Sequence, residues 1–226
     1  RPRQPRAERE PHRAGADDRE RSGHRAYDSL DAVQRLAVWV SRVFHPFAVP
    51  VPTLLVALRL LGVGWREAFA WTALCIAVAI VPPTLFLVAQ RLRRGDGDWY
   101  VTVRAERRSL YALGGACLVV LLALLWSWNA PRALVACLVA AIVANAIGAG
   151  LNRVTKVSVH AGSAAGCATL LGWLAPALAP LLAAAVALVG WARLRLGHHT
   201  LEQVALGAGI TAACIGLALA WSGSGA

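Results

Sequence analysis

Residues 110–128 read LYALGGACLVVLLALLWSW and contain no charged residue. A stretch of this length and composition is typical of a helix that crosses a lipid bilayer, which needs about 20 mostly apolar residues. The whole chain supports this interpretation, because 58% of its 226 residues are hydrophobic and its mean hydropathy is +0.54. These values are typical of a polytopic membrane protein rather than of a soluble domain.

Six further apolar segments accompany this stretch and predict an all-α transmembrane helical bundle of about 6–7 spans. The candidate spans are residues 47–63, 68–88, 110–128, 132–150, 161–179, 181–193 and 204–221. Pro82 and Pro83 predict a kink in the second span. The sixth span is short, and we expect its helix to continue through Arg195, whose head can reach the interface.

Small residues at regular positions predict close helix packing. They are Gly162, Ala164, Gly166, Gly207 and Gly209. Such residues allow two membrane helices to approach each other, although small residues can also be permissive filler.

The N-terminal part differs in composition from the rest, so we expect residues 1–26 to form a disordered charged arm before one membrane domain, residues 27–226. The arm mixes arginine with acidic residues, proline and glycine and lacks apolar periodicity. Its expected partners are anionic lipid headgroups. Nucleic-acid binding is the competing interpretation, and the interleaved acidic residues count against it. Residues 27–44 predict an amphipathic helix in the membrane interface.

Three polar connections, residues 91–108, 151–160 and 193–203, hold nearly all the charge outside the arm. Two predicted spans separate each connection from the next. Because an even number of crossings returns the chain to the same membrane face, all three connections can meet at one surface. A site built from all three requires this arrangement.

The third connection carries the strongest motif. Arg193 lies six residues before His199, and Gln203 lies one helical turn after it. One helix end can therefore present a cation, an imidazole and an amide together, and these groups suit the holding and attack of a phosphate.

The second connection contains another histidine in an apolar setting, His160, within the sequence KVSVH. Lys156, the only lysine of the chain, and Ser158 precede it. Ionisable groups are costly in a membrane, which favours a chemical role. The alternative is a histidine that caps a helix or lies in the interface.

These motifs resemble those of the type-2 phosphatidic acid phosphatase (PAP2) superfamily. Its third motif has an arginine and a histidine separated by five residues and then an acidic residue, where this chain has Gln203. Its second motif is Ser-Gly-His after a proline, and here Val157 and Val159 replace the proline and the glycine. The resemblance extends through the helix that follows His199.

The first connection matches the family's first motif only at its end. That motif is a lysine separated by six residues from Arg-Pro, whereas here Tyr100 stands at the lysine position and Arg108 at the proline position. Arg107 corresponds to the arginine. Arg104 would lie one helical turn away and supply a second cation. The alternative is a basic juxtamembrane segment that contacts headgroups.

The resemblance implies a metal-independent lipid phosphatase without a cofactor. His199 would attack phosphorus and form a phosphohistidine, His160 would protonate the leaving group, and Gln203 would orient His199. The predicted phosphate-binding residues are Arg193, Arg107, Lys156, Ser158 and Arg104. The apolar body offers no acidic cluster for Mg²⁺ or Zn²⁺, and its five cysteines stand singly. We expect no metal.

The implied substrates are polyprenyl phosphates or diphosphates, or phosphatidic-acid-like lipids, which would place the chain in isoprenoid or phospholipid metabolism. Two alternatives stay open: a catalytically impaired relative that binds phospholipid or a partner, and a lipid phosphotransferase. The arm and all three connections share one predicted face. Because positive residues favour the cytoplasm, we expect an integral protein of the bacterial plasma membrane with a cytoplasmic N-terminus and active site.

Overall fold

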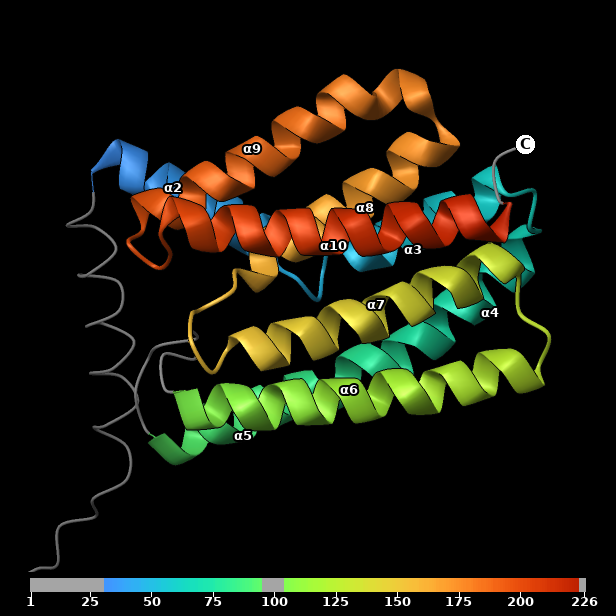
Figure 1. The fold of residues 1–226 in the computed structure, drawn as a ribbon, viewed down its shortest axis with the longest axis horizontal. Coiled ribbons are helices and arrows are strands. Elements are labelled where there is room, and N and C mark those ends of the chain that lie inside the picture. Colours follow the sequence, from blue (N-terminus) through green and yellow to red (C-terminus); the bar gives the residue numbers. More distant parts are fainter. Residues whose placement is uncertain (1–30, 95–103, 224–226) are drawn as a thin grey trace, which may run out of the picture.

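The structure is a computed structural model that describes residues 31–94 and 104–223, and side chains over 31–93 and 107–223. Within these ranges every regular element is a helix and no strand occurs, which confirms the all-α prediction. The elements of Figure 1 are α2 (Ala32–Val43), α3 (Pro50–Leu60), α4 (Trp65–Cys75), the π-helical turn η1 (Ile76–Ile80), α5 (Val81–Arg94), α6 (Arg104–Ser127), α7 (Arg132–Leu151), α8 (Val159–Leu174), the 3-10 turn η2 (Pro176–Leu178), α9 (Ala179–Arg195) and α10 (Leu201–Ser222). The predicted disordered arm, residues 1–26, lies outside the described residues.

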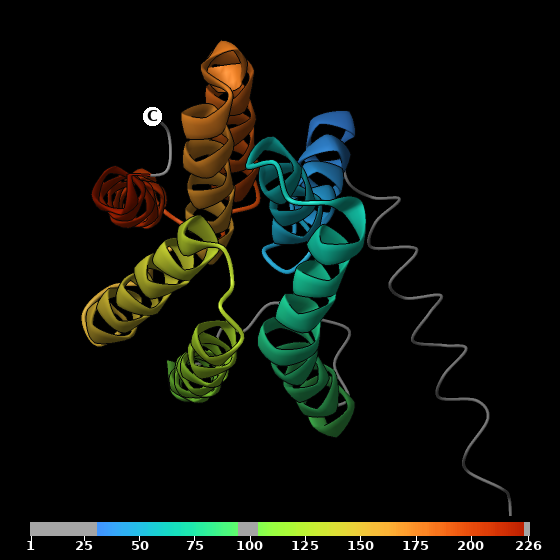
Figure 2. The same cartoon turned by 90° about the vertical axis from the view of Figure 1, so that its right-hand side faces the viewer.

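Five helices of the described chain are long and apolar enough to cross a membrane, which makes this an integral membrane protein. They are Trp65–Arg93, Arg107–Ser127, Arg132–Leu151, Pro176–Arg195 and Leu201–Ser222. The expectation that helix α9 continues through Arg195 is confirmed. Figure 2, which looks along the helices, shows that the long helices run in similar directions around the bundle.

The remaining two predicted spans, residues 47–63 and 161–179, yield helices that are shorter than predicted. Helix α3 has 11 residues, begins at Pro50 and is followed by Gly62 at φ 80°. Helix α8 has 16 residues and ends before Pro176, which starts a separate turn. Proline and left-handed glycine end helices inside apolar stretches. Hydropathy alone therefore overestimated both lengths, and the predicted count of 6–7 spans is not confirmed.

The helix pair α4 and α5 is joined by a π-helical turn where the sequence predicts a kink. The N–H of Val81 donates to the carbonyl of Ile76, five residues back. Pro82 and Pro83 have no N–H, and in a regular α-helix their rings would clash with carbonyls one turn earlier. The wider turn before them accommodates both prolines.

Glycines bring α8 and α10 into close contact. A Cβ at Gly162 would lie 2.9 Å from the Thr211 hydroxyl oxygen, and a Cβ at Gly166 would lie 2.8 Å from the Thr211 methyl carbon. A Cβ at Gly207 would collide with the carbonyl oxygen of Ser158. The packing role predicted for these three glycines is confirmed. The one predicted for Gly209 is wrong, because no atom lies within 4 Å of a Cβ there.

Helix α2 is the amphipathic helix predicted within residues 27–44. Asp31 begins it with a capping box to Gln34. Its buried face packs against the end of α9, through Ala37, Val40 and Ala192. Apolar side chains beside this face are exposed: Val33, Leu36, Trp39 and Val43.

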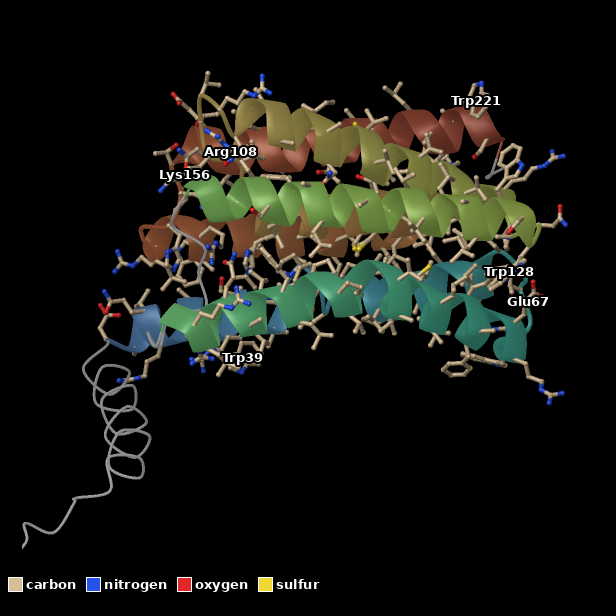
Figure 3. The ribbon with its side chains drawn as sticks, turned by 90° about the horizontal axis from the view of Figure 1, so that it is seen from below. Trp39, Glu67, Arg108, Trp128, Lys156 and Trp221 are labelled. Carbon is tan, nitrogen blue, oxygen red and sulfur yellow. The ribbon has the colours of Figure 1, made fainter. Side chains whose placement is uncertain are left out.

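The two ends of the bundle differ in chemistry. Figure 3 shows Trp39, Arg108 and Lys156 toward one end and Glu67, Trp128 and Trp221 at the other. In Figure 1, the end of α5, the start of α6, and the α7–α8 and α9–α10 connections all lie at the first end. The described ends of the first connection and the other two connections therefore meet at one end of the bundle, as predicted, while residues 95–103 lie outside the described residues.

Candidate functional site

A cavity of about 380 Å³ opens at the end of the bundle where the polar connections meet. Its polar lining comes from the α2–α3 loop, α6, α7, the start of α8, the end of α9 and the two connections after α7 and α9. These polar residues are His45, Arg107, Tyr111, Asn145, Lys156, His160, Arg193, His198 and His199. Segments far apart in the sequence thus contribute to one site.

His199 lies just before helix α10, where Gln203 holds its ring. Nδ1 of His199 is 3.2 Å from Oε1 of Gln203. The N–H of Thr200, which can only donate, lies 3.3 Å from the same Gln203 atom and identifies it as the oxygen. Nδ1 of His199 therefore carries the proton in the neutral ring, and Nε2 keeps its lone pair.

The surroundings of His199 keep its imidazole neutral. Burial lowers the pKa of His199 to about 4, assisted by the Arg193 cation and opposed by the hydrogen bond to Gln203. The Arg107 guanidinium lowers this pKa further, so its charge acts on His199. At neutral pH the ring can act as a nucleophile, because only the neutral form offers a lone pair.

Arg193 is a buried cation in the last turn of α9, with only 3% of its surface exposed. Its Nη1 donates to the hydroxyl of Ser41 on α2 over 2.7 Å. The contact of α2 with α9 thus places the guanidinium beside the cavity. The pKa of His45 is lowered mainly by burial and further by the charge of Arg193.

His160 lies in the first turn of α8. Its Nε2 is buried and makes no hydrogen bond within the described part of the chain. Burial lowers the pKa of His160 strongly. The charges of Arg193 and then of His45 lower this pKa further. The ring is therefore neutral at pH 7, and its Nε2 has no hydrogen-bond partner among the described residues.

Ser158, predicted to bind phosphate, instead holds two helix ends together. Its hydroxyl caps α8 by accepting the N–H of Ala161 over 3.4 Å, and its own N–H donates to the carbonyl of Gln203 over 3.1 Å. Ser158 is fully buried and lies outside the cavity lining. It fixes the start of α8 against the start of α10, which sets His160 relative to His199.

The other predicted residues divide in three ways. Arg107 and Lys156 line the cavity with Arg193, His160 and His199. Gln203 does not line it but contacts His199, and its amide donates to the hydroxyl of Thr155 over 3.5 Å. The side chain of Arg104 lies outside the described residues.

His45, in the α2–α3 loop, is a site residue that the motifs did not reveal. Its ring lies edge-on to that of His160, with centroids 5.5 Å apart. Its Nδ1 accepts the N–H of Phe47 over 3.3 Å, and Ser163 of α8 donates to the carbonyl of Pro46 over 3.3 Å. An ionisable residue between an amphipathic and an apolar segment is the sequence feature that could have indicated it.

Across residues 31–94 and 104–223, no three His, Cys, Asp or Glu side chains lie close enough together to share a metal ion. The cavity instead combines cations with neutral imidazoles, which suits an anionic tetrahedral group. Comparison of the chain with protein-family models, curated proteins and solved structures gives no match.

Proposed function

We propose that this chain is an integral-membrane lipid phosphatase of the PAP2 type, which cleaves a phosphomonoester or diphosphate through a phosphohistidine and without a metal ion. One observation carries the proposal. His199, His160, Arg193, Lys156 and Arg107 come from the three polar connections and line one cavity at the end of an apolar bundle. A phosphorylated lipid would place its phosphate at this end of the bundle while its hydrocarbon chain stays in the membrane.

The arrangement supports attack by His199 on phosphorus. Its Nε2 lone pair forms the P–N bond while the bond from phosphorus to the leaving oxygen breaks. Nδ1–H donates to Gln203 throughout, which stabilises the orientation of the ring. The cations of Arg193, Arg107 and Lys156 neutralise the phosphate oxygens. Water then cleaves the P–N bond and releases phosphate.

His160 would supply the proton that the leaving oxygen takes. Burial and the Arg193 charge lower its pKa in the empty site. A bound phosphate would add negative charge beside these cations, and an adjacent anion raises the pKa of a histidine. His160 therefore gains its proton together with the substrate, and it recovers a proton from the water that cleaves the intermediate.

We propose that the site faces the cytoplasm of a bacterial plasma membrane, and charge placement supports the cytoplasmic orientation. The end of the bundle with the cavity carries many cations besides those of the site, on α2 and at the ends of α5, α6, α7 and α9 that lie there: Arg35, Arg42, Arg91, Arg93, Arg108, Arg153 and Arg195. The opposite end of the described chain carries Arg59, Arg66 and Arg132. Cytoplasmic ends of membrane helices are richer in positive residues.

Phosphate release from purified protein in detergent tests the function. The substrates are a prenyl phosphate, a prenyl diphosphate and a diacyl phosphatidate, each with and without EDTA, and His199→Asn is the control. We expect release by the wild type in EDTA, inhibition by vanadate, and no release by His199→Asn. Loss of activity on chelation with recovery in Mg²⁺ would refute the metal-free mechanism.

A catalytically impaired protein that binds phospholipid is the second candidate, because neutral Gln203 stands where the family has an acidic residue. Gln203 keeps the orientation of His199 but adds no charge to stabilise the cation that develops on it. Headgroup binding by a folded protein that releases no phosphate from any of the three lipids would favour this candidate.

A further inference from the structure

The cavity has an apolar part whose residues have no role in the proposed reaction. One wall consists of Ala79 from η1 with Pro83 and Leu87 from α5, and the other consists of Leu110, Gly114 and Leu118 from α6. We call these six residues the apolar groove. In Figure 3, α5 and α6 run alongside each other from the end that carries Lys156 into the bundle.

The spacing of these residues makes the groove continuous along both helices. Members of each set are four positions apart, so they lie one above the other on one helix face. Eight residues of helix correspond to about 12 Å along the axis. The neighbouring residues Leu85 and Val119 lie on outward faces, with 62% and 55% of their surfaces exposed. The groove is thus distinct from the general lipid-facing surface.

The polar and apolar parts belong to one cavity, and Arg107 stands next to the start of the α6 wall. Arg107, Lys156 and Arg193 also line this space. A ligand that fills it needs an anionic head and an apolar chain directly attached. Water finds few partners in the groove, because its six residues carry no side-chain polar atom and only Asn145, whose Oδ1 would lie 3.8 Å from a Cβ at Gly114, adds one beside them.

We infer that the apolar groove holds one hydrocarbon chain of the phosphorylated lipid whose phosphate lies among Arg107, Lys156 and Arg193. This inference rests on the proposed function and assigns the part of the site that selects the substrate. A volume of about 380 Å³ is small for a ligand pocket. A single chain occupies the groove, and a second chain of the same lipid stays in the bilayer.

The groove acts by orientation more than by affinity. Lipid tails are as apolar as leucine, so transfer of a chain from bilayer to groove gains little from the hydrophobic effect. A chain held over two helical turns instead fixes the angle at which the phosphate meets His199. Correct orientation of this kind can contribute much of a rate enhancement.

Matched tryptophan variants test the inference. Leu87→Trp and Leu118→Trp fill the groove, whereas Leu85→Trp and Val119→Trp place the same side chain on the outward faces of the same helices. Each variant is assayed with a long-chain prenyl phosphate and with a short, water-soluble phosphate monoester. We expect the inner variants to lower kcat/KM for the long chain by about tenfold or more and to leave the short ester within about twofold of wild type.

The outer variants should match the wild type with both substrates. Equal loss with both substrates in the inner variants would show a general disturbance of the cavity and overturn the inference. Wild-type activity of the inner variants with the long chain would overturn it too.

A binding experiment separates this inference from the proposed function. A long-chain alkyl phosphate with a photoreactive group at the end of its chain is cross-linked to the wild type, and the modified residues are identified by mass spectrometry. Labelling of the six groove residues supports the inference even where no phosphate is released. Labelling confined to outward positions such as Leu85 and Val119 overturns it even where phosphate is released.

Discussion

At the scale of single residues, Gln203 is the position on which the histidine chemistry depends most. Its side-chain oxygen accepts from the ring of His199 and from the N–H of Thr200, so one residue caps α10 and orients the histidine. Glu202 is exposed and makes neither contact. The structure therefore favours Gln203 over Glu202 as the partner of His199.

Gln203→Ala should lower kcat by about tenfold or more, because the ring loses the acceptor that fixes its tautomer. Gln203→Asp should retain or raise the rate, since a carboxylate accepts the same bond and stabilises the developing cation. Both are measured as phosphate release under saturating substrate. A silent Gln203→Ala together with an inactive Glu202→Ala would show that Glu202 orients the histidine instead.

His45 is a positioning residue that acts through His160. Its ring is among the groups that lower the pKa of His160, after burial and Arg193 and before His199 and His198. His45→Phe keeps an aromatic edge there and removes this contribution, which acts only at acidic pH because burial lowers the pKa of His45. His160 acts as an acid, and activity falls as pH rises through its pKa in the substrate complex.

We therefore expect the alkaline limb of the kcat–pH profile to keep its position in His45→Phe, and the rate at acidic pH to rise relative to the rate at neutral pH, because a protonated His45 no longer opposes the protonation of His160. The profile is measured between pH 5 and pH 9 with one lipid phosphate. A lower rate with an unchanged profile would mean that His45 serves only the packing of the α2–α3 loop.

At the scale of helices, the contact between α8 and α10 sets the two histidines relative to each other. Gly207 allows the α10 backbone to lie against Ser158, the residue before α8 begins. Two positions further on, Gly209 faces open space. These two glycines of one helix therefore form a matched pair.

Gly207→Ala should lower stability, whereas Gly209→Ala should not. A Cβ at Gly207 meets a backbone oxygen that no side-chain rotation relieves, and overpacking of this kind costs about 1–3 kcal/mol. At Gly209, alanine should be neutral or stabilising by up to about 1 kcal/mol, the usual preference in a helix. Thermal unfolding in detergent measures both. Equal melting temperatures would contradict the close contact between α8 and α10.

At the scale of the whole molecule, positive charge is concentrated at the end that contains the cavity. Glu67 lies at the opposite end and is exposed (Figure 3). Glu202 lies in the first turn of α10, three residues after His199, and is also exposed. These two acidic residues can report which end faces the cytoplasm without touching the proposed machinery.

Single-cysteine variants Glu67→Cys and Glu202→Cys, made with the native cysteines replaced by alanine, should react differently with a membrane-impermeant maleimide. In intact cells we expect labelling at position 67 and none at position 202 until the cells are opened, because the cation-rich end stays inside. Labelling at position 202 from outside would place the site on the external face.

Sequence patterns alone were sufficient for the parts of the protein that depend on nearby residues. The apolar runs predicted the helices, and the spacing of Arg193, His199 and Gln203 predicted the contact between the last two. An even number of predicted crossings also brought the connections to one end. These features follow from helical periodicity and bilayer thickness, which act along the chain.

Only the tertiary structure decided the contacts between distant segments. It set His45 against His160, joined Ser41 to Arg193, and turned Gly207 toward a neighbour but Gly209 away. In an almost uniformly apolar chain, hydropathy barely distinguishes the faces of a helix, because lipid and protein interior are similarly apolar. Which face meets a neighbour, and so which residues enter the cavity, is settled by how the helices pack in three dimensions.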